Sequence, residues 1–235
     1  MADALPPRRG RAAARNTPNR FERLHVEPDA AALVEADGAE AAGRVPTRFF
    51  RDTTRTALAR NDSPDLPFRY GLNPYRGCEH GCAYCYARPS HEYLGFSAGL
   101  DFETKIVVKP EVPRLLAEAF QKPSWEPQVV ALSGNTDPYQ PVERRLELTR
   151  RCLEVFLRHR NPVGLITKNA LVLRDLDLLR ELAAFDGVAV RISLTSLRDE
   201  VTNAMEPRTS RPALRLKAIR ALAEAGVPVG VMAAP

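Results

Sequence analysis

The chain has 235 residues, of which 27% are charged and 44% hydrophobic, with a formal net charge of +5 at pH 7. This length suffices for one sizeable hydrophobic core, so we expect one main domain with a tail. No apolar run approaches the roughly 20 residues that cross a bilayer, and the N-terminus lacks the apolar core of a signal peptide. We therefore expect a cytoplasmic protein without membrane contact, and its four cysteines do not indicate a secreted disulfide scaffold.

The first 45 residues divide into two blocks of opposite charge. Residues 1–25 carry six arginines against two acids, and residues 26–43 carry five acids and no base. Neither block shows hydrophobic periodicity, which predicts a disordered tail over residues 1–45. The arginines suit contact with nucleic-acid phosphates, but a solvated tail without a partner fits the same composition. Residues 46–67 are more mixed, and we expect a linker or N-terminal extension there, ahead of a core at 68–235.

Three of the four cysteines, Cys78, Cys82 and Cys85, lie within eight residues in the spacing Cys-x3-Cys-x2-Cys. Thiolates this close in sequence converge on one metal centre more readily than they reach distant partners. Four cysteines usually hold a [4Fe–4S] cluster or a structural zinc, so three leave one metal position open. The zinc alternative needs a fourth ligand, for which His80 and His91 are available, although His80 lies between two ligands and competes for the same loop volume.

After this loop, strand-like runs alternate with helical patterns. Hydrophobic patterns predict strands at 68–72, 128–132, 163–167, 187–194 and 227–232, and helices at 110–121, 141–160, 171–184 and 212–225. Strands that alternate with helices form right-handed βαβ units, so the order predicts an α/β fold with a curved parallel sheet and its helices outside. The fourth cysteine, Cys152, falls on the apolar face of the long helix and is expected to be a buried core thiol.

Polar residues follow three of these predicted strands at the point where each ends. They are Ser133, Asn135 and Asp137 after 128–132, Lys168 after 163–167, and Ser193 at the end of 187–194, with Arg208 further along the chain. Ligands of parallel α/β folds bind at the carboxyl ends of the strands, so these side chains are expected to converge on one pocket. Serine and asparagine are also common turn residues, and a lysine in a loop is often only solvated.

The cysteine loop resembles that of the radical S-adenosylmethionine (SAM) enzymes, in which Cys-x3-Cys-x-aromatic-Cys holds a [4Fe–4S] cluster. Tyr84 occupies the aromatic position, and the flanking residues 73–77 and 86–89 are similar to a bacterial branch that resembles spore photoproduct lyase. The resemblance covers residues 48–235. It implies a partial TIM-like (β/α)6 barrel that lacks its last strand–helix unit, as in a C-terminally truncated chain.

The resemblance also implies a chemistry. SAM would bind the open iron, and the reduced cluster would split SAM into methionine and a 5′-deoxyadenosyl radical that abstracts hydrogen from a substrate. The residues implied to contact SAM are Tyr84 of the loop, Ser133, Asn135 or Asp137 at its ammonium, Lys168 or Arg208 at its carboxylate, and Ser193 or Thr195 at its ribose. The implied partners are a reductant such as flavodoxin or ferredoxin and, by analogy alone, a nucleic-acid substrate.

The sequence leaves alternatives to radical catalysis. The loop could serve an iron–sulfur or zinc binding module with a structural role, or a cluster that only transfers electrons. The chain also departs from the lyase branch, because Gly134 stands where that branch has a hydrogen-donating cysteine. The resemblance therefore implies the shared cofactor chemistry and not the same repair reaction.

Overall fold

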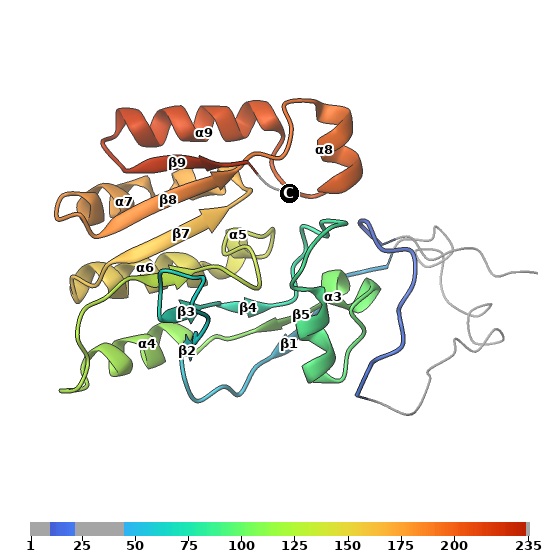
Figure 1. Cartoon of the computed structure of the whole chain (residues 1–235), viewed down its shortest axis with the longest axis horizontal. Helices are drawn as coiled ribbons and strands as arrows, with labels where there is room; N and C mark the ends of the chain where they lie inside the picture. Colours follow the sequence, from blue (N-terminus) through green and yellow to red (C-terminus); the bar gives the residue numbers. More distant parts are fainter. Residues whose placement is uncertain (1–9, 22–44, 234–235) are drawn as a thin grey trace, which may run out of the picture.

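The computed structural model describes residues 10–21 and 45–233, and its largest element is a six-stranded sheet (Figure 1). In spatial order the strands are β2 (Leu58–Arg60), β3 (Tyr70–Leu72), β6 (Val130–Leu132), β7 (Val163–Thr167), β8 (Val188–Ser193) and β9 (Val229–Met232). Neighbours pair in parallel from β3 to β9, and only β2 runs antiparallel to β3. The predicted α/β fold is confirmed, with its five parallel strands where the sequence places them.

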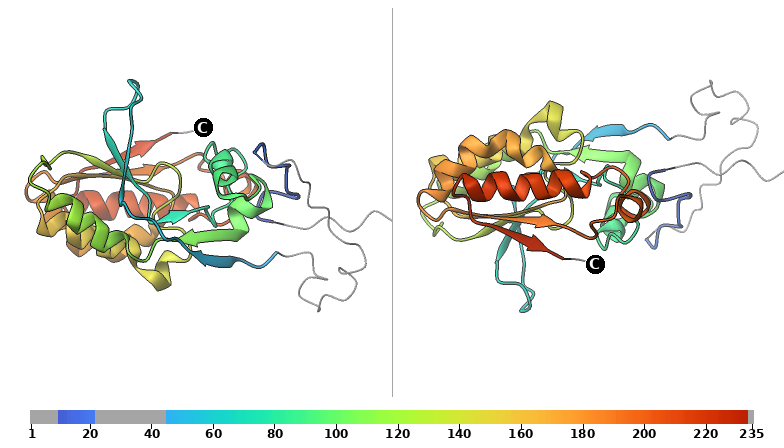
Figure 2. Two further views of the ribbon diagram at one scale, coloured as in Figure 1. Left: turned by 90° about the horizontal axis from the view of Figure 1, so that it is seen from below. Right: turned by 90° about the horizontal axis from the view of Figure 1, so that it is seen from above.

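Helices cover one face of this sheet, while the β2–β3 hairpin projects from the other (Figure 2). They are α4 (Val112–Phe120), α6 (Leu148–Arg158), α7 (Leu176–Ala183) and α9 (Pro212–Glu224), all close to predicted positions. In α4 the buried Val112, Leu116 and Phe120 recur every four residues, which gives the helix one apolar face toward the strands. Cys152 is fully buried in the same core, as predicted.

The long helix predicted at 141–160 is instead two helices, α5 (Glu143–Leu146) and α6. Between them Glu147 has a φ of 51°, a left-handed conformation that ends α5. The buried carboxylate of Glu143 accepts the N–H of Thr149 at 3.1 Å, close to the start of α6. Arg174 at 2.8 Å and the hydroxyl of Tyr75 bind the same carboxylate, so the break has a polar core of its own.

A second, three-stranded sheet lies beside the first. It is formed by β1 (Arg48–Arg51), β5 (Lys105–Val108) and β4 (Tyr75–Arg76), with the short helices η1 (Arg88–Leu94) and α3 (Leu100–Thr104) before β5. The sequence predicts a linker or N-terminal extension at 46–67, and in the structure this segment contributes β1 to this sheet and β2 to the large one. Strands of four and three residues with exposed side chains carry too short a pattern to detect.

Part of the predicted disordered tail is bound to the core. Residues 10–21 run along η1 and α3, where they make several hydrogen bonds, so the prediction for these residues is wrong (Figure 1). Residues 1–9 and 22–44 of the predicted tail lie outside the described residues. No helix within the described ranges is long and apolar enough to cross a membrane.

Candidate functional site

The cysteine loop connects β4 to η1, and hydrogen bonds from its backbone N–H groups hold its conformation. The N–H of Cys78 donates to Phe102 O at 2.9 Å, and the N–H of Cys85 donates to Cys82 O at 3.3 Å. The N–H of Ala83 donates to Met205 O at 2.8 Å, which ties the loop to the end of α8 (Asp199–Met205). All three loop cysteines are free thiols.

The environment of these thiols fits a bound cluster. Burial raises the pKa of Cys82, and the charges of Cys78 and Glu206 raise it further, while Lys168 lowers it. Burial also raises the pKa of Cys85. Thiols of this kind ionise when a metal offsets the charge, because the thiolate is the form that binds. Three unpaired thiols in one loop, with a lysine beside them, are a donor set suited to iron–sulfur ligation.

Neither histidine offered by the sequence is placed as a zinc ligand. The ring nitrogens of His80 lie 3.3 Å from Asp137 Oδ2 and 3.3 Å from Asn169 Nδ2, and Nε2 of His91 lies 2.9 Å from Lys105 O. Among the residues that the structure describes, no three His, Cys, Asp or Glu side chains gather as they would around a single metal ion. A cubane does not require this, since each cysteine binds a different iron.

Tyr84, the aromatic residue of the loop, is bound to a buried carboxylate. Its hydroxyl donates to Glu206, and Thr195 donates to the same oxygen at 2.6 Å. The other carboxylate oxygen accepts from Arg215, which is fully buried and also donates to Ser193 O at 2.9 Å. Glu206 therefore joins the cysteine loop to the carboxyl end of β8 and to α9.

Sequence reasoning missed the central role of this pair. Neither Glu206 nor Arg215 is among the site residues predicted from the sequence. Arg215 lies three and seven residues before Ala218 and Leu222, which are buried on the core face of α9. An arginine at a core position of an amphipathic helix was the available signal, because such a charge is buried only when it is paired.

Burial alone would raise the pKa of Glu206. The hydrogen bonds from Thr195 and Tyr84 and the charge of Arg215 outweigh burial, so the pKa falls below the ordinary value of 4.5. Burial beside this carboxylate raises the pKa of the Tyr84 phenol. At neutral pH the carboxylate is thus ionised and the phenol is a donor.

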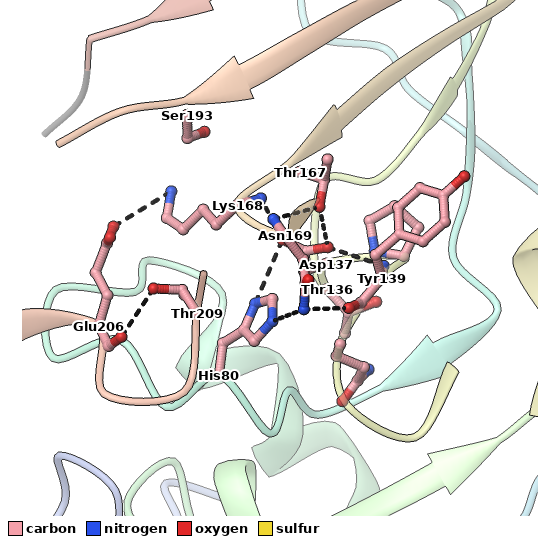
Figure 3. Close-up of polar contacts among 12 residues, drawn as sticks. His80, Thr136, Asp137, Tyr139, Thr167, Lys168, Asn169, Ser193, Glu206 and Thr209 are labelled. Atoms are coloured by element: carbon pink, nitrogen blue, oxygen red, sulfur yellow. Dashed lines mark hydrogen bonds and ion pairs between the residues drawn. The ribbon is translucent and has the colours of Figure 1, made fainter. Parts of the chain in front are cut away.

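Lys168 and Ser193 lie where the sequence predicts them, at the ends of neighbouring strands (Figure 3). The Nζ of Lys168 is 3.7 Å from Glu206 Oε1 and 5.7 Å from the centre of the Tyr84 ring, and its side chain is 19% exposed. The ammonium group thus lies beside the cysteine loop without a tight ion pair, and it can still bind an anion.

The carboxylate of Asp137 is already hydrogen-bonded to other groups of the protein. Its carboxylate accepts from the N–H of Tyr139 at 2.8 Å, and from the hydroxyl of Thr167 and the N–H of Lys168, both at 2.7 Å (Figure 3). Burial opposes ionisation, but His80 beside it and these hydrogen bonds lower its pKa. The geometry thus makes Asp137 a residue that orients the start of the Lys168 loop and leaves it no free acceptor for SAM.

The other predicted residues after β6 form a turn. The N–H of Asn135 donates to Asn73 Oδ1 at 3.2 Å, and the hydroxyl of Ser133 lies 3.4 Å from Thr136 O. Between them Gly134 has a φ of 112°, and a Cβ there would meet nothing within 4 Å. Backbone conformation rather than space therefore favours glycine at this position.

Arg208 and Lys168 contact different acidic residues. Its Nη1 donates to Glu79 Oε1 at 3.0 Å, and its N–H approaches His80 O at 3.4 Å. The side chain is 37% exposed. Of the two cations proposed for the SAM carboxylate, Arg208 is the one paired closely with an acid, while Lys168 lies 3.7 Å from Glu206.

These features define an α/β protein with a three-cysteine loop at the carboxyl ends of a parallel sheet. The family model described as the Radical SAM superfamily matches residues 72–234, and the chain belongs to this superfamily. The cysteine loop, Lys168, Ser193 and Glu206 all lie within the matched residues. The arm at 10–21 lies outside them.

Curated relatives extend beyond this chain. A protein of Mycobacterium tuberculosis, described as uncharacterized, is 44% identical over 170 residues, which cover 72% of this chain and 50% of that protein. A similarly described protein of Acidianus two-tailed virus is 32% identical over 179 residues, covering 73% of this chain and 57% of the viral protein. The chain thus spans about half the length of the curated relatives it matches.

Solved structures of spore photoproduct lyase share the fold. One variant aligns with a TM-score of 0.61 at 23% identity, covering 92% of this chain and 57% of that chain. A variant with bound AdoMet and dinucleoside spore photoproduct aligns with a TM-score of 0.59 at 21% identity, with 92% and 57% coverage. At these identities the likeness establishes the fold, which agrees with the lyase-like fold that the sequence predicts.

Proposed function

We propose that this chain carries the core of a radical SAM enzyme, with a [4Fe–4S] cluster on Cys78, Cys82 and Cys85. The observation that carries the proposal is the position of Lys168, whose ammonium lies between the cysteine loop and Glu206 at the end of the parallel sheet. A cation beside a three-thiol site is suited to a cofactor that carries its own carboxylate. When bound, a reduced cluster would supply the electron for reductive cleavage of SAM.

The protein side chains divide the work of binding SAM. Lys168 pairs with the carboxylate, and Ser193 at the end of β8 meets the ribose. The turn at Ser133 and Asn135 provides acceptors for the ammonium group. Asp137 orients Lys168 by accepting a hydrogen bond from the backbone N–H of Lys168. Tyr84, whose hydroxyl donates to Glu206, connects the cysteine loop to the end of β8.

We propose nucleic acid as the class of substrate. The support is the shared fold with spore photoproduct lyase, whose structures include one with a dinucleoside spore photoproduct. Gly134 supplies no thiol, and its positive φ disfavours a cysteine there, so the product differs from that of the lyase branch. We also propose a one-electron carrier such as flavodoxin or ferredoxin as the reductant and the cytoplasm as the location.

The test is anaerobic incubation of the iron-loaded protein with dithionite and SAM, followed by chromatographic detection of 5′-deoxyadenosine. We expect slow formation even without substrate, and none from Cys85→Ala, which lacks one thiolate. The longer relatives give a second protein for the same assay, since they extend past the region matched here. A protein that holds its cluster, binds SAM and still forms no 5′-deoxyadenosine would falsify radical catalysis and favour the binding-module alternative.

A further inference from the structure

The outer face of the cysteine loop rests on a second buried carboxylate, Glu103 of α3, whose side chain is fully buried. Three successive backbone N–H groups of residues 10–21, called here the arm, donate to it. The donors are Arg11 at 3.0 Å, Ala12 at 3.1 Å and Ala13 at 2.7 Å. Consecutive N–H groups that converge in this way form an anion-binding nest, here filled by a side chain of the same protein.

The arm also touches the cysteine loop directly. A Cβ placed on Gly81 would lie 2.3 Å from Arg11 Cβ and 2.3 Å from Glu103 Oε2, and Gly81 has a φ of +64°. Any side chain at this position would therefore strike both the arm and the carboxylate that holds it. The loop glycine between the first two cysteines is the contact surface for the arm.

A second chain of contacts runs from Glu103 to a cluster cysteine. Arg88 lies 3.8 Å from Glu103, and its guanidinium donates to Cys82 O at 2.9 Å and 3.2 Å. Without the arm, Glu103 would lose three donors and gain access to water, so its hold on Arg88 would weaken. The carbonyl of Cys82 would then lose the group that fixes it.

Further contacts anchor the arm along α3 and η1. Asn16 exchanges two hydrogen bonds with Asp101, at 3.0 Å and 2.9 Å, and Asn19 donates to Glu92 O at 3.1 Å. Arg20 pairs with the buried carboxylate of Glu92 at 2.5 Å. The arm is thus bound to residues of both η1 and α3.

We infer that the arm completes the cluster site, with Glu103 as the positioning residue that fixes the cysteine loop against it. The inference rests on the proposed function for the identity of the cluster, although the loop contacts exist without one. The arm lies outside residues 72–234, which the superfamily model matches. In this role it slows opening of the loop and thereby loss of iron to solvent.

The test compares truncations that begin on either side of the arm. A variant lacking residues 1–21 should lose iron to a chelator about tenfold faster than the full chain, because a bonded contact of this size restrains local opening. A variant lacking residues 1–9 should behave as the full chain does. Hydrogen exchange of loop amides in the metal-free protein should rise about tenfold in the first variant only.

Two substitutions separate the arm from general loss of structure. Glu103→Gln replaces one acceptor oxygen by an amide NH2 group, which cannot accept from the arm, and Asn16→Ala removes both hydrogen bonds between Asn16 and Asp101. Both should accelerate iron loss and loop exchange, whereas Glu118→Gln on the exposed side of α4 should not. Equal rates of iron loss and loop exchange in the full chain and in the 1–21 deletion would overturn the inference. If no variant binds a cluster, the proposed function fails, and exchange in the metal-free protein still decides the role of the arm.

Discussion

The cysteine loop is held from two sides by buried carboxylates that differ in what they bind. Glu206 holds it from the sheet side through the side chains of Tyr84, Thr195 and Arg215. Glu103 holds it from the outside through the backbone of the arm. Every residue of the first arrangement lies within the superfamily match, whereas the second joins Glu103, which lies within the match, to an arm that lies outside it. We call the first arrangement the inner frame and the second the outer frame.

The loop thiols set the largest expected effect, since both frames are built around them. Replacing Cys78, Cys82 or Cys85 with alanine should in each case abolish the cluster, because two remaining thiolates cannot hold a cubane. Iron and acid-labile sulfide in anaerobically prepared protein measure this. Cys152→Ala is the matched control, and it should keep its iron and lose only packing in the core. Equal iron loss in all four variants would mean that Cys152 also serves the cluster.

Disrupting the inner frame should lower the unfolding free energy of the protein. Glu206→Gln leaves the charge of Arg215 buried without its partner, and breaking such a pair costs roughly 3–5 kcal/mol of unfolding free energy. Urea unfolding gives this value directly. Glu200→Gln, at an exposed position of α8, should change stability by less than about 0.5 kcal/mol. A Glu206→Gln variant as stable as the control would show that the pair contributes nothing net.

Lys168 tests whether the inner frame serves SAM. If its ammonium pairs with the carboxylate of SAM, Lys168→Ala should weaken SAM binding by about one to two decades, or roughly 1.5–3 kcal/mol. Cluster content should stay unchanged, since Lys168 is not a ligand. Anaerobic calorimetry with the iron-loaded protein measures the affinity. Unaltered affinity would remove Lys168 from the site and with it the main support for the proposed function.

Several residues on the sheet side of the cysteine loop could be predicted from sequence, but almost nothing of the contacts between the arm and Glu103 could be. Cysteine spacing, the aromatic slot and polar residues after apolar strands are signals of residue type, and they led to Tyr84, Lys168 and Ser193. The pairing of Glu206 with Arg215 depends on which face of α9 is buried, which only the packing decides. Asp137 has the expected position, but its acceptors are taken by backbone groups that no sequence pattern reveals.

The outer frame was missed for a physical reason. Its donors are main-chain N–H groups, which every residue except proline carries, so Ala12 and Ala13 have no distinguishing side chain. The arginines around them resemble a solvated tail, and hydrophobic periodicity is absent. A short segment that binds through backbone groups and a few polar side chains is therefore indistinguishable from disorder at the level of composition.

The pH dependence of stability tests the role assigned to Glu206. Because the pKa of Glu206 in the folded protein lies below 4.5, the unfolded chain takes up its proton first as the pH falls. Its contribution is complete above about pH 4.5 and is lost as the pH falls through the folded-state pKa. The difference in unfolding free energy between the wild type and Glu206→Gln should therefore shrink below this pH. A difference that grows on acidification would reverse the assigned direction of the shift.

Arg208 should show the smallest effect, and it separates the two cations that the sequence offered for the SAM carboxylate. Its guanidinium is paired with Glu79 at 3.0 Å and is partly exposed. Its charge is therefore already balanced by an acid and screened by water, so a ligand should gain less from it than from Lys168. Arg208→Ala should change SAM affinity by less than about threefold, with a modest loss of order on the outer side of the loop. The same calorimetry measures it beside Lys168→Ala. If Arg208→Ala weakened SAM binding as much as Lys168→Ala, the carboxylate would lie between the two frames, and the loop side of Glu79 would belong to the SAM site.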